Sequence, residues 1–269
     1  MPSVSVNGQS LHYTDSGGDG PSIVLSHPMF LDAVHMAPLA DTLAEEGYRV
    51  VTFDHRCHGE TKFDGQPFPL IQCAKDALGL ASALGIERAT FAGELLSATI
   101  ALHVALLEPE RVAGLLLVGP TAYATDPGEI ASLNVGLAQW KEFGPQASEF
   151  ARIAQAATGS SQAAADLMDR WRSADWRQVQ VMADAWLDRA GITDNLGQIT
   201  CPAVVIHGSS EFYIPLAHGR HVYENLGGPK SFGTVDRQFQ ALSIVQDPKT
   251  LDLVRGFMRD QFPVWRPTA

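Results

Sequence analysis

The stretch Arg88-Ala-Thr-Phe-Ala-Gly93-Glu94-Leu95-Leu96-Ser97-Ala98 decides the fold of this chain. A short apolar run over 89–92 reaches Gly93 and then passes directly into an apolar-periodic helix. A strand, a tight turn and a helix in this order raise the residue at the apex of the turn above the edge of a sheet. That residue is Leu95, which has no oxygen, nitrogen or sulfur atom to act as a nucleophile.

Composition narrows the class of protein and its partners. The chain has 269 residues, of which 45% are hydrophobic and 18% charged, as in a soluble globular domain. Its net charge of −11 disfavours nucleic acid and anionic membranes as partners. The apolar runs fall short of the roughly 20 residues of a membrane helix, and the first residues lack the pattern of a secretory signal. The three cysteines lie far apart in the sequence, which suggests reduced thiols. We therefore expect a cytoplasmic protein with a small-molecule substrate or ligand, and a homodimer is compatible with this.

Strands and helices alternate along most of the chain. Asn7-Gly8 predicts a hairpin turn between two short strands. Further strands are predicted at 22–26, 48–53, 89–92, 112–118, 201–208 and 230–235, and helices at 38–46, 71–84, 216–226 and 248–260. This order predicts an α/β fold with a mostly parallel, twisted sheet flanked by helices. Residues 124–196 lose the strand pattern and are expected to form a helical cap on a core of residues 1–123 and 197–269.

Three further motifs follow strands in the order of one known family. They are Ser26-His27-Pro28-Met29, Asp54-His-Arg56-Cys-His58-Gly59-Glu-Thr61 and His207-Gly208-Ser-Ser-Glu211-Phe-Tyr-Ile-Pro215. With the turn at Leu95, they make the chain resemble the α/β-hydrolase superfamily over nearly its whole length. It looks most like capped bacterial esterases, enol-lactonases and C–C-bond hydrolases. The resemblance implies an α/β-hydrolase fold with a helical cap.

The departures from the family concern its catalytic triad. Leu95 stands where the family has its Ser, and Glu211 stands where it commonly has Asp. The family's His is expected near residues 236–241, yet no His follows Val222. Loss of triad members costs on the order of 10⁴–10⁶ in turnover, so acyl-serine hydrolysis is not the expected main activity.

The resemblance implies a pocket bordered by backbone N–H groups and polar side chains. Backbone N–H groups of Leu96 and of Met29 or Phe30 would form the oxyanion hole, and Leu95 would lie on the pocket floor. Glu211 is the first candidate for a general base, because a carboxylate without a His partner should have a raised pKa; a structural hydrogen bond to nearby backbone is the alternative.

Two other side chains are candidate catalytic groups. Glu94 lies beside the turn, and bonding to the cap or a neighbouring strand is its alternative role. His27 is the last candidate, and bracing of the oxyanion loop is its alternative role. His55 and His58 are only a weak zinc signal, so we expect no metal and no cofactor.

Three functions remain open on the sequence. The first is an enzyme that uses the oxyanion hole and pocket acid/base groups on a carbonyl compound, in lyase, isomerase, cyclase or decarboxylase chemistry. The second is a non-catalytic ligand-binding protein of the same fold. The third is an esterase or lactonase whose triad has been replaced deliberately.

Overall fold

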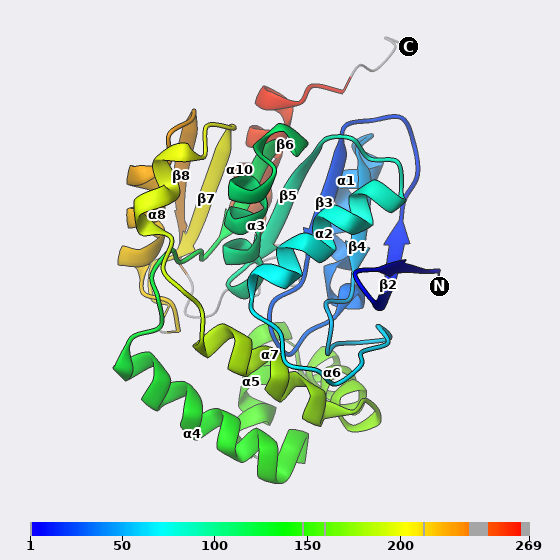
Figure 1. The fold of residues 1–269 in the computed structure, drawn as a ribbon, viewed down its shortest axis with the longest axis vertical. Helices are drawn as coiled ribbons and strands as arrows, with labels where there is room; N and C mark the ends of the chain where they lie inside the picture. Colours follow the sequence, from blue (N-terminus) through cyan, green and yellow to red (C-terminus); the bar gives the residue numbers. More distant parts are fainter. Residues whose placement is uncertain (1, 147, 159, 212, 237–246, 265–269) are drawn as a thin grey trace.

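The sheet orders the rest of the molecule. The computed structural model describes residues 2–146, 148–158, 160–211, 213–236 and 247–264, and these residues form an eight-stranded sheet in the order β1-β2-β4-β3-β5-β6-β7-β8 (Figure 1). β1 and β2 form an antiparallel hairpin, β2 pairs antiparallel with β4, and every pairing from β4 to β8 is parallel. The strands are β1 (Ser3–Val6), β2 (Gln9–Asp15), β3 (Ser22–Ser26), β4 (Arg49–Phe53), β5 (Ala89–Glu94), β6 (Val112–Val118), β7 (Ala203–Gly208) and β8 (Lys230–Val235).

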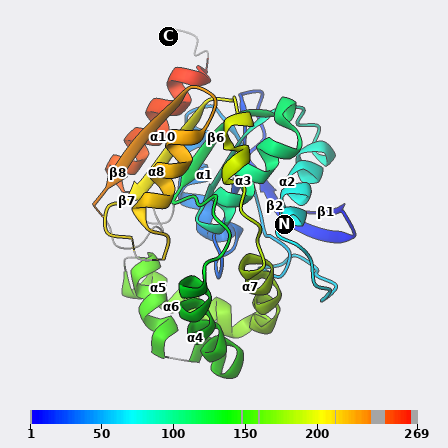
Figure 2. The same cartoon turned by 60° about the vertical axis from the view of Figure 1, so that its left-hand side comes forward.

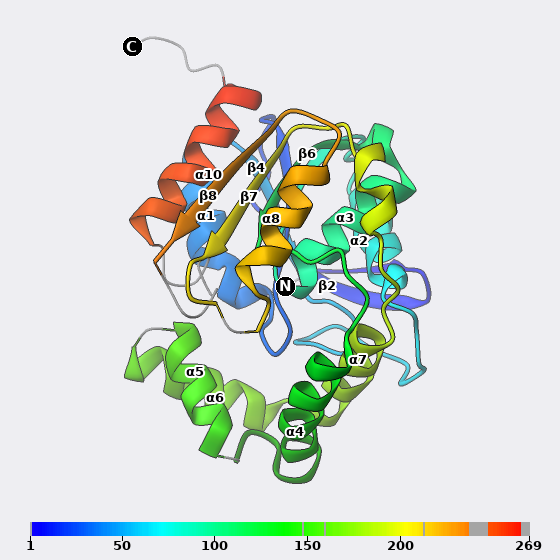
Figure 3. The ribbon, with the colours of Figure 1, turned by 90° about the vertical axis from the view of Figure 1, so that its left-hand side faces the viewer.

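Helices cover both faces of this sheet, as Figures 1 and 3 show. α1 (Ala37–Glu45) and α10 (Pro248–Gln261) lie on one face. α2 (Ile71–Ala83), α3 (Leu96–Leu107) and α8 (Leu216–Asn225) lie on the other. The predicted α/β class, with a mostly parallel sheet between helices, is confirmed.

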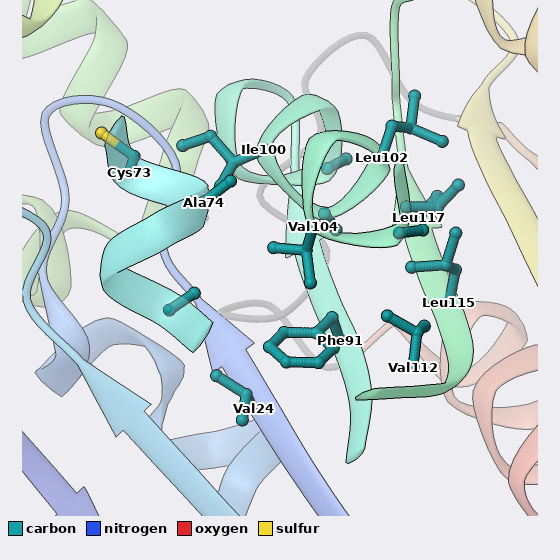
Figure 4. Close-up of a cluster of buried hydrophobic side chains, with 14 of the residues drawn as sticks. Val24, Cys73, Ala74, Phe91, Ile100, Leu102, Val104, Val112, Leu115 and Leu117 are labelled. Atoms are coloured by element: carbon teal, nitrogen blue, oxygen red, sulfur yellow. The ribbon is translucent and has the colours of Figure 1, made fainter. Parts of the chain in front are cut away.

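Alternating side chains of the central strands fill the two apolar cores. Phe91 of β5 and Leu115 and Leu117 of β6 belong to the cluster beneath α2 and α3, where Figure 4 shows them with Ile100 and Val104 of α3. Ala92 of β5 and Leu116 and Val118 of β6 belong to the opposite cluster, beneath α1 and α10. A strand turns successive side chains to opposite faces, so strands covered on both sides are apolar throughout.

A helical insertion lies beyond one end of the sheet (Figure 2). Its helices are α4 (Pro127–Phe143), α5 (Ser148–Thr158), α6 (Ser161–Ser173) and α7 (Val179–Leu187), all within the interval 124–196 for which a cap is predicted. Its two ends meet, because the Ile192 N–H donates a hydrogen bond of 2.8 Å to the Ala122 carbonyl oxygen. Across the residues that the structure describes, no helix has the length and apolar character needed to span a bilayer.

The insertion packs in two separate ways. Side chains of α4, α5 and α6, which include Trp140, Phe150 and Trp171, form a separate apolar cluster with Leu31 and with Val179 at the start of α7. Met182 and Trp186 of α7 instead belong to the main core. α7 is therefore anchored on the α/β core through these two side chains, while α5 and α6 pack in the separate cluster.

Candidate functional site

The turn between β5 and α3 has a strained backbone. Leu95 lies at φ 51° and ψ −109°, a region that costs a residue with a side chain about 1–3 kcal/mol. Its N–H donates to the Val118 carbonyl oxygen at 2.8 Å, and its own carbonyl accepts from the Thr99 N–H at 3.1 Å. Backbone bonds to β6 and α3 hold the apex, and the Leu95 side chain is only partly buried.

Ser97 fixes the same turn from beneath. Its buried hydroxyl accepts the Glu94 N–H at 2.8 Å and lies 3.0 Å from the carbonyl oxygens of both Ser26 and Glu94. A Cβ on Gly93 would come within 2.6 Å of this hydroxyl, so the approach requires glycine there. These bonds commit the hydroxyl to holding the turn together.

The oxyanion loop, residues 27–32, follows β3 beside this turn, because Ser26 is paired with Gly93. His27 is fully buried, with Nδ1 donating to the Pro28 carbonyl oxygen at 2.8 Å and Nε2 accepting the His55 N–H at 3.0 Å. Burial lowers the His27 pKa to about 4, so the ring is neutral at pH 7. Both ring nitrogens are engaged by backbone, an arrangement that supports the bracing role of His27 over a catalytic one.

Met29 and Phe30 join this loop to the insertion. The Met29 side chain is partly buried and packs against both the main core and the cluster of the insertion. Phe30 has a left-handed backbone at φ 68°. Its carbonyl oxygen accepts a hydrogen bond from Trp171 Nε1, and its ring packs edge-on against Trp140, at 5.0 Å between ring centroids.

Two buried carboxyl groups lie at the same edge of the sheet. Glu94 ends β5 and is 2% exposed; Glu211 follows β7 and is 8% exposed. One Glu211 oxygen, Oε1, accepts the Tyr213 N–H at 2.8 Å, which is the structural bond weighed from the sequence. A part in catalysis for either carboxylate remains a proposal.

A backbone donor lies at this edge as well. Leu96 is the first residue of α3, where N–H groups have no acceptor one turn earlier and the helix dipole is positive. The structure thus gathers His27, Glu94, Leu95 and Leu96 at the ends of neighbouring strands, with Glu211 two strands further along the sheet. The resemblance places the family's His near residues 236–241, and all of these except Asp236 lie outside the described residues.

The motif after β4 acts as a scaffold. The buried Asp54 carboxylate accepts from the Ala33 N–H at 2.7 Å and from His12 Nδ1 and the Glu60 N–H at 2.8 Å each. Cys57 has a left-handed backbone at φ 71°, and burial raises its pKa well above the usual range. A protonated thiol is a poor nucleophile, so Cys57 packs rather than reacts.

Sequence reasoning missed the contacts that fix the oxyanion loop. Asp32 pairs with Arg170 on α6, although the two are 138 residues apart, and it also accepts from His35 Nδ1 at 2.7 Å. The sequence signal was the placement of an acidic residue just before a helical turn, which identifies a cap. The distant arginine had no such signal.

Three imidazoles form a buried cluster next to this loop. The ring of His27 lies 4.7 Å from that of His55 and 4.9 Å from that of His58, centroid to centroid. Within the described part of the chain, neither ring nitrogen of His55 has a hydrogen-bond partner. Burial lowers the pKa of His58 to about 3 and that of His55 well below its usual value.

Comparisons with known proteins give matches over most of the chain. The family model described as alpha/beta hydrolase fold matches residues 21–240. The putative carbamate hydrolase RutD of Rhizobium rhizogenes is 25% identical over 93% of this chain and 98% of its own length. The human serine hydrolase BPHL is 25% identical over 84% of this chain and 76% of its own length.

Solved structures share the fold. An esterase of Thermogutta terrifontis superposes with a TM-score of 0.85 at 20% identity, covering 97% of this chain and 100% of its own. The enol-lactonase of Burkholderia xenovorans superposes with a TM-score of 0.83 at 24% identity, covering 96% and 99%.

The histidine cluster predicts acid sensitivity. Below pH 6.5 the unfolded chain binds protons on these imidazoles, whereas folded His27 stays neutral to about pH 4 and folded His58 to about pH 3. The stabilisation is complete above pH 6.5 and is lost as the pH falls, by about 1.4 kcal/mol per pH unit for each imidazole. Urea unfolding from pH 7.5 to 4.5 measures this slope. His55→Phe removes one titrating ring and should flatten it, and an unchanged slope in that variant would contradict the assignment.

The strained turn predicts an inverted glycine effect. At Leu95, the Gly variant should be more stable than the Ala variant by about 1 kcal/mol, because only glycine adopts this backbone without a penalty. In an ordinary helix the order is the reverse, and Ala151→Gly on the exposed face of α5 is the matched control, with an expected loss of roughly 0.5–1 kcal/mol. Chemical denaturation of the three variants decides the matter, and a Leu95→Gly protein less stable than Leu95→Ala would mean that the turn relaxes.

Proposed function

Because this chain belongs to the alpha/beta hydrolase fold family, we propose that it is a small-molecule enzyme that works without a serine nucleophile. Its relatives are enzymes named as hydrolases, and they cover most of its length. We infer a carbonyl compound as the substrate. The reaction is a proton transfer of the lyase, isomerase, cyclase or decarboxylase type.

The retained turn at Leu95 carries this proposal. A left-handed leucine costs about 1–3 kcal/mol, and such strain persists at sites where the geometry is used. Because the Leu95 side chain cannot attack a substrate, we infer that the backbone of the turn is its functional part. The Leu96 N–H, at the positive end of α3, is the donor that the turn presents to a developing negative oxygen.

Buried carboxylates supply the second half of the chemistry. A carbonyl oxygen held by N–H donors makes the neighbouring C–H more acidic, because the enolate charge falls on the bound oxygen. Glu211, in the loop after β7, is the proposed base, and Glu94 is next in order. His27 comes last, because both of its ring nitrogens are bonded to backbone groups. The sequence of events is proton removal, enolate stabilisation at the oxyanion hole and return of the proton elsewhere on the substrate.

Non-catalytic ligand binding is the second candidate, and one observation favours it. The partly buried Leu95 side chain packs against the main core, so it can serve as an apolar floor for a ligand. The enzyme and the ligand-binding protein would use the same predicted pocket, and a measurement of turnover distinguishes the two functions.

The Glu211→Gln variant tests the base. In D₂O, NMR of a panel of 1,3-dicarbonyl compounds, 2-oxo acids and unsaturated lactones should reveal α-proton exchange or conversion by the parent protein. Glu211→Gln keeps the shape and removes the proton acceptor, so kcat should fall about 10²–10⁴-fold with KM nearly unchanged. Glu110→Gln, on an exposed turn, is the control and should leave both constants unchanged.

Two outcomes would overturn parts of the proposal. Full activity of Glu211→Gln would move the base to Glu94. Calorimetric binding of panel compounds without any turnover by the parent would replace the enzyme with the ligand-binding protein.

A separate experiment addresses covalent hydrolysis. We expect no adduct with a fluorophosphonate probe and no burst with p-nitrophenyl esters, because Leu95 offers no nucleophile. Leu95→Ser alone should not restore ester hydrolysis, since no His follows Val222 to take the hydroxyl proton. A stoichiometric adduct on Ser97 of the parent, or efficient hydrolysis by Leu95→Ser, would contradict this.

A further inference from the structure

The oxyanion loop makes both apolar and polar contacts with the helical insertion. Three consecutive residues take part. The Phe30 ring and the Leu31 side chain belong to the apolar cluster of the insertion, and the Asp32 carboxylate pairs with Arg170. The loop is therefore packed as part of the α5–α6 layer, although the chain places it directly after β3.

Two residues of α6 make the polar contacts. Arg170 donates through Nε to Asp32 Oδ2 at 2.9 Å and through Nη2 to the same oxygen. The neighbouring Trp171 donates through Nε1 to the Phe30 carbonyl oxygen. Asp32 is buried, and its partners hold its pKa well below the usual range, so it is charged at pH 7.

The backbone of the loop depends on such support. Phe30 lies at φ 68°, a conformation that a residue with a side chain keeps only where its surroundings impose it. Its carbonyl is fixed by Trp171 and its ring by Trp140, at 5.0 Å, and by Phe150, at 5.7 Å. All of these contacts come from the insertion.

We propose that Arg170 and Trp171 are positioning residues, through which α6 sets the conformation of the oxyanion loop. The peptide N–H group of Met29 or Phe30 that forms the oxyanion hole is oriented for this only while α6 is docked. Movement of α5 and α6 would therefore dismantle one side of the oxyanion hole. The consequence for turnover, though not the coupling itself, rests on the function proposed above.

Hydrogen–deuterium exchange measured by mass spectrometry tests the coupling in the unliganded protein. Arg170→Met and Trp171→Phe keep most of the packing and remove the polar contacts. Exchange in a peptide covering residues 27–34 should become about 10-fold faster in both variants, with a β6 peptide unchanged. Arg172→Met is the matched control, because this arginine on the same helix is exposed and pairs only with Asp169 in the described residues, so its loop exchange should equal that of the parent.

Two results would overturn the proposal. One is loop exchange that stays at the parental rate in both variants. The other is an equal rise in the loop and β6 peptides, which would mean general destabilisation. Arg170→Lys is a milder variant that should fold in any case, and it should fall between the parent and Arg170→Met because it keeps the charge and loses the planar fork.

Steady-state kinetics measure an effect on kcat that a merely structural role of these residues would not produce. On the panel compound that the parent converts, Arg170→Met and Trp171→Phe should lower kcat roughly 10–100-fold with little change in KM, as a misplaced transition-state donor does. Unchanged kcat in variants with a fast-exchanging loop would overturn the link to catalysis. If the parent converts no compound, the proposed function fails, and the exchange experiment still judges the coupling.

Discussion

The left-handed backbone at Leu95 is the constraint on which the site depends. Leucine has no preference for this conformation, so the surroundings must impose it. They do so through main-chain bonds to β6 and α3 and through the Ser97 hydroxyl, which binds the ends of β3 and β5 together. None of these bonds involves the Leu95 side chain. The hydrogen bonds that shape the turn therefore do not depend on which side chain stands at its apex.

The parallel sheet turns this local constraint into a site. Because β3, β5, β6 and β7 run in the same direction, the segments that follow them emerge at one edge. This brings His27, Glu94 and Glu211 to the same side of the molecule, although they are far apart in the chain. The surroundings then set the protonation of each polar group. Burial lowers the pKa of His27 and keeps the ring neutral, whereas the bonds of Asp32 to His35 and Arg170 lower its pKa and keep it charged.

The fold was predictable from the sequence because it follows from short-range patterns. Apolar strands, a Gly93 turn and a periodic helix each involve a few neighbouring residues, and β3, β6 and β8 begin and end where predicted. β5 runs two residues further than predicted, because Glu94 pairs with Val118 despite its charge. The predictions for Glu211, Glu94 and His27 rest on resemblance, and their chemical roles stay predictions. The support of the oxyanion loop was not predictable, since the Asp32–Arg170 pair joins residues 138 positions apart, and a left-handed phenylalanine has no sequence signature.

The hydrogen bond between Ile192 and Ala122 has a consequence for how such a protein can change over evolutionary time. Since the insertion leaves and rejoins the core at one point, a different helical segment could be exchanged for it without altering the order of the strands. The exchange would not be neutral. An incoming segment would have to bring its own partner for the Asp32 carboxylate and its own apolar seat for Phe30, or the oxyanion loop would lose its shape. The insertion can thus be exchanged as far as the chain connections are concerned, but the oxyanion loop depends on its side-chain contacts. A new substrate pocket on this core must therefore arise together with new residues that support that loop.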